Sequence, residues 1–146
     1  MAGLEVIGSS VEHELKELPV SSLTAAVGDL LELTAGATTW AATTSSSNYF
    51  SRKAIVYKAV VSADTVALCY ELNGAEKVKA ESANNSNTAH NGDRMLLTDS
   101  NTVNNTGTDN TSQNVCFIQD GTSGAVADKR IIGRVIVCPS VDPDAT

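Results

Sequence analysis

The sequence has few of the residues from which catalytic and metal sites are built. His13 and His90 are its only histidines, and neither has a cysteine or a second histidine near it in the sequence. No G-x-S-x-G, P-loop or H-E-x-x-H pattern occurs. A minimal enzyme site would have to combine His90 with Asp93 and Asp99, and no nucleophile with a base and an orienting group is visible around them. We therefore predict no catalytic residues, no cofactor and no metal site, and regard both histidines as surface residues.

Cysteine is also scarce, and its spacing argues against a zinc site. Cys69, Cys116 and Cys138 lie far apart, and no C-x-x-C pair occurs. Each cysteine lies in or at the end of an apolar run of strand length. We expect three buried free thiols, as in a protein made in a reducing compartment.

Basic residues are outnumbered, since 10 lysines and arginines stand against 17 acidic residues and the net charge is −7. An acidic surface repels phosphate backbones, so we expect no nucleic acid partner. No run of about 18 apolar residues exists, so we expect no membrane partner. The first 18 residues lack a basic region followed by an apolar one, and we expect no secretory signal.

Short apolar runs separated by Asn, Thr, Ser, Asp and Gly make up most of the chain. The runs have the length of strands, and the polar stretches have turn chemistry. Residues 65–72 alternate strictly, and Asn73-Gly74 after them is typical of a two-residue hairpin with residues 75–81 as the returning strand. The pattern predicts an all-β domain over residues 21–139, a compact β-barrel, β-tulip or sandwich of short antiparallel strands.

Two segments of the sequence resemble each other. Residues 28–34 (GDLLELT) match residues 92–98 (GDRMLLT) in type. After each copy come a loop rich in Thr, Ser and Asn, a strand, a short turn and another strand. An internal duplication would explain the order, and two turns of similar chemistry arising separately would explain it as well.

Residues 1–20 differ from the rest and are interpreted as an N-terminal arm. A capping box at residues 9–12 and an apolar stripe after it predict a short helix that Pro19 ends. The arm either packs on its own β-domain or docks on another subunit. Its apolar residues, which are the predicted contact residues, are Leu4, Val6, Ile7, Val11, Leu15 and Leu18. Residues 140–146 form a short acidic tail.

Aromatic residues make up only 4% of the chain. Trp40, Tyr49 and Phe50 would suit a sugar-stacking platform, but they more simply supply bulk to a core that is short of aromatic residues. The acidic loop at residues 99–109 departs from the calcium-binding EF-hand pattern at its fifth and sixth positions. That loop is typical of a turn-rich segment held by side-chain bonds to the backbone.

Four segments carry a likeness to a known family: the turn and strand at residues 27–34, the strand pair at 54–72, the second turn and strand at 92–99, and the strand at 131–137. Their layout resembles that of the capsid decoration, or cement, proteins of tailed bacteriophages. Members of that family have compact β-barrel or β-tulip domains and assemble as homotrimers. They clamp neighbouring major capsid protein subunits, often through an N-terminal arm. The arm of this chain departs from the family because its middle looks helical.

The resemblance implies a structural virion protein without enzymatic activity. Its partners would be the major capsid protein and further copies of itself. It would be made in the host cytoplasm and located on the exterior of the capsid. The alternative is a carbohydrate-binding β-domain of the kind found in phage fibres and adhesins.

Overall fold

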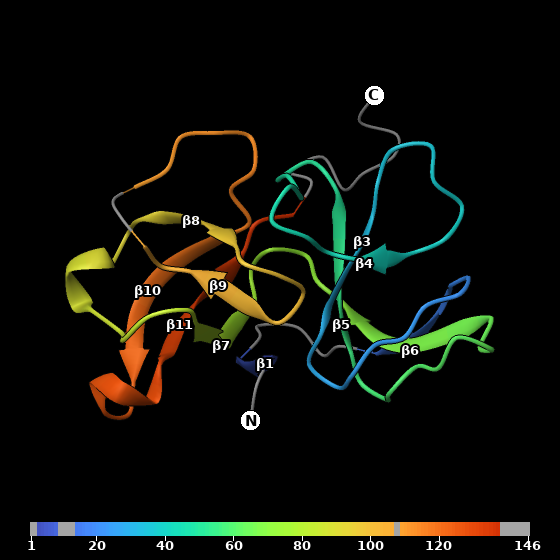
Figure 1. The fold of residues 1–146 in the computed structure, drawn as a ribbon, viewed down its shortest axis with the longest axis horizontal. Helices are drawn as coiled ribbons and strands as arrows, with labels where there is room; N and C mark the ends of the chain where they lie inside the picture. Colours follow the sequence, from blue (N-terminus) through green and yellow to red (C-terminus); the bar gives the residue numbers. More distant parts are fainter. Residues whose placement is uncertain (1–2, 9–13, 107–108, 138–146) are drawn as a thin grey trace.

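The computed structural model describes residues 3–8, 14–106 and 109–137. In this part of the chain the elements are eleven β-strands and two short 3-10 helices. The strands form two barrels that lie side by side, the first on the right of Figure 1 and the second on the left. The all-β fold predicted from the sequence is confirmed.

The first barrel is built from five strands. They are β2 (Leu15–Pro19), β3 (Leu30–Leu33), β4 (Ala41–Ala42), β5 (Arg52–Val56) and β6 (Val66–Glu71), and their order in the sheet is β2-β6-β5-β3-β4. All four pairings are antiparallel. A parallel bridge between Val20 and Trp40 brings the two outer strands together. There the N–H of Trp40 donates to the carbonyl oxygen of Pro19 at 2.8 Å, which closes the barrel.

The second barrel repeats this arrangement. Its strands are β7 (Lys77–Ser82), β8 (Arg94–Leu97), β9 (Thr102–Asn104), β10 (Phe117–Ser123) and β11 (Arg130–Val135), in the order β7-β11-β10-β8-β9. A parallel pairing of β9 with β7 closes it. Strand β1 (Leu4–Gly8) then adds to the outer edge of β7. The 3-10 helices η1 (Thr88–His90) and η2 (Val126–Asp128) lie in its loops.

The two barrels match strand by strand and in register, with β2 to β6 corresponding to β7 to β11 in sequence order. Corresponding cross-strand pairs are Leu18–Ala67 and Ala80–Ile131, Leu31–Ala54 and Met95–Phe117, Ala54–Glu71 and Phe117–Val135, and Val20–Trp40 and Ser82–Val103. Because strand order, pairing and closure agree between the two barrels, the chain contains an internal structural repeat.

The repeated Gly-Asp turn has the same conformation in both halves. Gly28 has a φ of 92° and Gly92 a φ of 90°, a region that glycine enters without the steric penalty of a side chain. The N–H of Gly28 donates to the carbonyl oxygen of Val56 (3.0 Å), and that of Gly92 to the corresponding residue, Gln119 (2.7 Å). The match between residues 28–34 and 92–98 in the sequence is therefore a match of three-dimensional turns.

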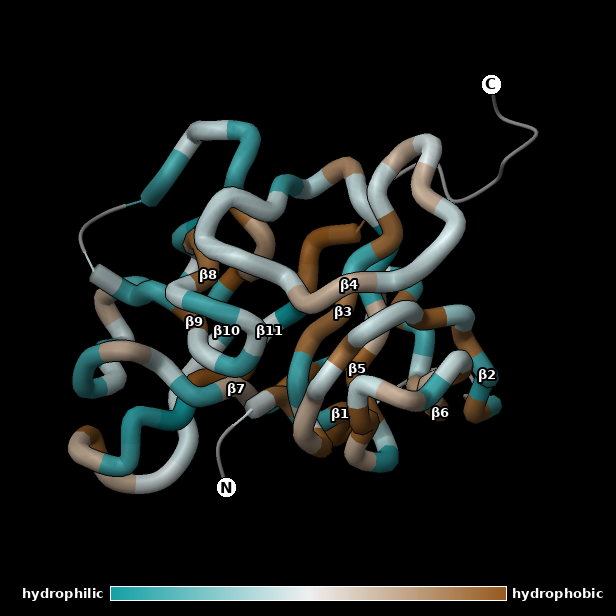
Figure 2. Tube along the Cα trace, turned by 45° about the vertical axis from the view of Figure 1, so that its right-hand side comes forward, coloured by the Kyte–Doolittle hydropathy of each residue, from teal (hydrophilic) through white to brown (hydrophobic). Residues whose placement is uncertain are grey.

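Each barrel has an apolar core, and the core of the second barrel extends into the contact between the two. Leu30 and Ile55 belong to the first barrel but point outside it, where they pack into the core of the second barrel together with Leu4 of β1. Figure 2 shows hydrophobic stretches of chain gathered where the barrels meet. A hydrogen bond from the N–H of Leu30 to the carbonyl oxygen of Ser100 (2.7 Å) also joins them. Apolar burial and backbone bonds thus fix the barrels to each other.

The helix expected in the arm is wrong over residues 15–18, which belong to strand β2. Leu18 and Val20 are both buried in the core of the first barrel, so the apolar spacing that matters there is two residues. Five residues of β2 pair with β6, and a helix of about two turns is too short to compete with such pairing. The capping box and Val11 lie outside the described residues.

The hairpin expected at Asn73-Gly74 is also wrong, because β6 and β7 belong to different barrels. The segment instead links the two halves. The buried side chain of Glu76 accepts hydrogen bonds from the N–H groups of Asn73 (2.9 Å) and Gly74 (3.0 Å), which holds the link in a compact turn. Strands β1 and β2 pair within the chain, so the described part of the arm packs on its own β-domain.

Candidate interaction surface

The outside faces of the two barrels differ in chemistry although their folds match. Side chains along each strand alternate between the inside and the outside of a barrel. The outside residues of β2 and β6 are Leu15, Glu17, Pro19, Val66, Leu68 and Tyr70. Their counterparts on β7 and β11 are Lys77, Lys79, Glu81, Arg130, Ile132 and Arg134. The first barrel is therefore mainly apolar at positions where the second barrel is mainly charged.

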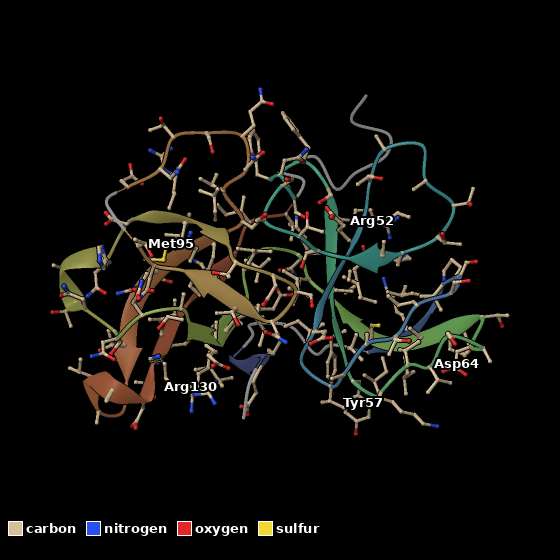
Figure 3. The ribbon with its side chains drawn as sticks, viewed as in Figure 1. Arg52, Tyr57, Asp64, Met95 and Arg130 are labelled. Carbon is tan, nitrogen blue, oxygen red and sulfur yellow. The ribbon has the colours of Figure 1, made fainter. Side chains whose placement is uncertain are left out.

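We name the apolar area of the first barrel the β2–β6 face and define it by Leu15, Tyr57, Val66, Leu68 and Tyr70. Leu15 is 37% exposed, Val66 48% and Tyr57 49%. The rings of Tyr57 and Tyr70 meet edge to face with their centroids 5.5 Å apart. Figure 3 shows Tyr57 pointing away from the first barrel. Two aromatic rings and three aliphatic side chains on neighbouring strands make the face mainly apolar, and the one carboxylate among them is Glu17, which lies opposite Leu68.

The second barrel covers only a part of the outside of the first barrel. Leu30 and Ile55 lie in the same row of the sheet as Tyr70 and Leu15, since Leu30 pairs with Ile55, Ile55 with Tyr70, and Tyr70 with Leu15. The first two are buried against the second barrel, Tyr70 is half-buried and Leu15 is exposed. The β2–β6 face is thus the continuation, beyond the second barrel, of a surface that is already used for packing.

Strand β2 also has an open edge. The N–H of Val20 donates to the carbonyl oxygen of Thr65 beside β6 (3.0 Å). In an antiparallel pair every second residue bonds to the partner strand, so Val20, Leu18 and Lys16 face β6 with their backbone groups. Leu15 and Glu17, which lie between these positions, direct their N–H and C=O groups away from β6. Pro19, which has no N–H, occupies the third such position. Within the described ranges no strand pairs with Leu15 or Glu17 on this side. A groove of about 260 Å³ lies on the other side of β2, along β6 and residues 58–64, with Glu17, Lys58 and Val66 in its walls.

The structure buries some of the six predicted contact residues and leaves others exposed. Leu4 and Leu18 are buried in the cores of the chain, and Val6 packs against the core of the second barrel. Ile7 and Leu15 are exposed, and Val11 lies outside the described residues. Sequence reasoning missed Tyr57, Val66, Leu68 and Tyr70. The signal that distinguishes three of them is the comparison of the two repeats, which requires the register of the strands.

An ionic cluster closes one end of the first barrel beside β2. Glu71 accepts hydrogen bonds from Arg52 (2.7 and 2.8 Å) and from Lys16 of β2 (3.2 Å). Burial raises the pKa of the Glu71 carboxyl, but the bonds from Arg52 and Lys16 outweigh it, and the pKa lies below its usual value. The Arg52 guanidinium lies 5.4 Å from the centre of the Trp40 ring. The ion pair between Lys16 and Glu71 links β2 to β6.

A buried polar cluster lies where the two barrels meet. The Nζ of Lys53, which is fully buried, donates to the Oγ of Ser51 (2.7 Å), and this hydroxyl donates to Glu32 (2.9 Å). Ser47 also donates to Glu32. The Sγ of Cys116, in the second barrel, lies 3.3 Å from the carbonyl oxygen of Ser47. These bonds satisfy charged groups that would otherwise be costly to bury, so the cluster has a structural role.

The cysteines have the environment predicted for buried free thiols where the structure describes them. Cys69 and Cys116 are both buried and free. Burial raises the pKa of each thiol to about 11, which leaves it protonated and unreactive at neutral pH. Cys138 lies outside the described residues.

The histidine and the acidic loop considered in the sequence have local partners. His90 Nδ1 lies 3.1 Å from the Asp93 carboxylate, three residues along the chain. The Asp99 side chain accepts the N–H of Asn101 (2.9 Å) in a local turn. Asp109 pairs with Arg94 (2.7 Å), and the hydrogen bonds from Arg94 lower the pKa of Asp109 to about 2. Among the residues that the structure describes, no group of three His, Cys, Asp or Glu residues is placed to hold a metal ion.

Trp40 is buried in the first barrel and is therefore not available as a sugar platform. None of the described helices has the length and apolar character needed to span a membrane. No protein-family model matches the chain, and no curated protein or solved structure matches it significantly.

Proposed function

We propose that this chain is a structural virion protein that decorates the outer surface of a phage capsid. It would clamp neighbouring major capsid protein subunits and would act as a homotrimer. The sequence layout described above supports the family. The single observation that carries the proposal is the β2–β6 face, a mainly apolar surface on an acidic all-β molecule whose second barrel has charged residues at most of the corresponding positions.

The energetics of such a surface suit attachment rather than catalysis. Burial of an aliphatic side chain contributes about 1.5–3 kcal/mol before the loss of side-chain freedom is subtracted. A face with three aliphatic and two aromatic side chains gives modest affinity for a single copy. Three linked copies would raise the overall affinity strongly, because the second and third contacts form at a high effective concentration.

The repeat supplies a sharp test. The double variant Leu15→Lys and Val66→Arg places on the first barrel the residues that the second barrel has at the corresponding positions, Lys77 and Arg130. Both wild-type residues are exposed, so the variant is expected to fold normally. The matched control is the reverse exchange in the second barrel, Lys77→Leu and Arg130→Val.

Co-sedimentation with undecorated capsids is the measurement, and light scattering gives the mass of each protein in solution. We expect the wild type and the control to sediment with capsids and the Leu15/Val66 variant to stay in the supernatant. If the wild type does not bind capsids, the proposed function is wrong. If the Leu15/Val66 variant binds as well as the wild type, the β2–β6 face is not the contact. A monomeric wild type would contradict a trimer preformed in solution.

The alternative function, carbohydrate binding, is favoured by one feature. Phe50 is 52% exposed and its ring lies 4.1 Å from that of Tyr49, a small aromatic platform at the surface. If the chain binds sugar there, Phe50→Ala would abolish binding to a glycan array. Retention of glycan binding in that variant would exclude the platform.

A further inference from the structure

We infer that the open edge of β2 accepts an extended segment of the shell protein as an added antiparallel strand, with Lys or Arg opposite Glu17. The identity of the partner rests on the proposed function, whereas the site itself rests on the repeat. Addition of a strand to a sheet edge is a common mode of protein recognition, in which backbone bonds give affinity and side chains give register.

The second barrel shows how this edge is filled. Strand β7 corresponds to β2, and its outward edge is covered by β1. Glu5 of β1 lies opposite Lys79 on β7, and Leu4 lies opposite Ala80. The residue of the first barrel that corresponds to Lys79 is Glu17, and the one that corresponds to Ala80 is Leu18. The edge is therefore the same in geometry in both barrels, and only the second has its strand among the described residues.

The charge at the edge is reversed between the barrels, and this reversal selects the occupant. Opposite charges directly across an antiparallel pair are stabilising, and like charges are destabilising. Glu5 faces Lys79 in the second barrel, so the strand that faces Glu17 is expected to carry a basic residue. The net charge of −7 also favours a basic segment.

Two other occupants fit the edge less well. Strand β1 of a second copy in the same register would place Glu5 against Glu17. Strand β2 of a second copy, paired antiparallel about its centre, would place Glu17 against Glu17. Each arrangement puts two carboxylates opposite each other, which is unfavourable. The occupant is therefore expected to come from another protein.

A synthetic peptide that copies β1 tests the site without any capsid. One peptide has the sequence of residues 2–9, AGLEVIGS, and the other has Lys in place of Glu5. Each is titrated into the full-length ¹⁵N-labelled protein, and the amide signals of Leu15 and Glu17 are followed by NMR. We expect the Lys peptide to shift these signals and to bind about fivefold more tightly than the Glu peptide, which corresponds to about 1 kcal/mol for the charge pair.

The charge swap is the decisive variant. Glu17 is exposed, so Glu17→Lys is expected to leave the fold unchanged and to reverse the preference, with the Glu peptide binding more tightly. Glu14→Lys has the same net charge, lies just outside β2, and is expected to retain the preference for the Lys peptide. The inference is overturned if the signals of Leu15 and Glu17 do not move, or if Glu17→Lys leaves the preference as it was.

Undecorated capsids separate this inference from the proposed function. Weaker co-sedimentation of Glu17→Lys than of Glu14→Lys supports strand addition by the shell protein. Equal binding of the wild type and both variants overturns strand addition and leaves the decoration function intact. Absence of binding by the wild type overturns the decoration function and with it the shell protein as occupant, while the peptide titration still decides whether the edge accepts a strand.

Discussion

Gly133 of β11 lies so close to β10 that any side chain there should be strongly destabilising. An ideal Cβ on Gly133 would be 1.9 Å from the carbonyl oxygen of Ile118 and 2.7 and 2.8 Å from two atoms of the Phe117 ring. The first contact is with backbone, so rotation of a side chain does not relieve it. In Gly133→Ala, β10 and β11 would have to move apart in the centre of the second barrel.

The magnitude follows from these contacts. Overpacking of a well-packed core costs about 1–3 kcal/mol, and the loss of a backbone hydrogen bond between the strands adds about 1 kcal/mol. We therefore expect Gly133→Ala to lower the free energy of unfolding by about 2–4 kcal/mol. Small domains have total stabilities of about 5–15 kcal/mol, so the loss would be large.

Urea denaturation followed by circular dichroism is the assay, with Gly121→Ala in β10 as the matched control. A Cβ on Gly121 would have no atom within 4 Å, so this variant is expected to stay within about 1 kcal/mol of the wild type. The first barrel has Cys69 at the position of Gly133 and Ala54 in place of Phe117, so a side chain there is accommodated by a smaller neighbour. If Gly133→Ala is as stable as Gly121→Ala, the register assigned to the second barrel is wrong.

Three further predictions concern the arm, the ionic cluster and the thiols. Leu4→Ala should lower the stability by about 2–4 kcal/mol in urea denaturation, because Leu4 is buried, while Ile7→Ala should change it by less than about 1 kcal/mol; equal effects would contradict the packing of β1. Glu71→Gln should cost about 1–2 kcal/mol at pH 7. The pKa of Glu71 is lower in the folded than in the unfolded protein, so the ionised carboxylate contributes its full stability above the unfolded pKa of about 4.3. That stability is lost as the pH falls through the folded pKa. A difference in unfolding free energy between Glu71→Gln and wild type that persists unchanged at pH 2 would refute this. In a Cys138→Ser variant the remaining thiols are Cys69 and Cys116, whose pKa values burial raises to about 11. They should react with a thiol reagent at pH 8 only when the protein unfolds. Rapid labelling of the native protein would show that they are accessible.

The fold class could be predicted from the sequence because the strands themselves carry a clear signal. Residues 65–72 alternate between two faces, and β6 lies within them. The two Gly-Asp turns are recognisable because a positive φ favours glycine in both. The burial of Cys69 and Cys116 could also be predicted from the apolar runs around them.

The failures came from choices that only tertiary pairing decides. Leu15 and Leu18 are three residues apart, a spacing that suits one face of a helix, and pairing with β6 makes the same segment a strand. Asn73-Gly74 has the chemistry of a tight hairpin, but β7 pairs with β11 and β1 rather than with β6. The β2–β6 face could not be located either, because its contrast with the second barrel depends on aligning strands by register.

The internal repeat has a consequence for how the chain folds. Pairing within each barrel joins strands of the same half of the sequence, whereas β1 pairs with β7, which is made much later (Leu4 pairs with Ala80). During synthesis the first barrel is complete in sequence before β7 exists, and β1 then has the similar edge of β2 within reach. Glu5 and Glu17 would repel each other in that misplaced pairing, whereas Glu5 and Lys79 attract in the native one. The charge reversal between Glu17 and Lys79 thus disfavours pairing of β1 with β2 and favours its native pairing with β7.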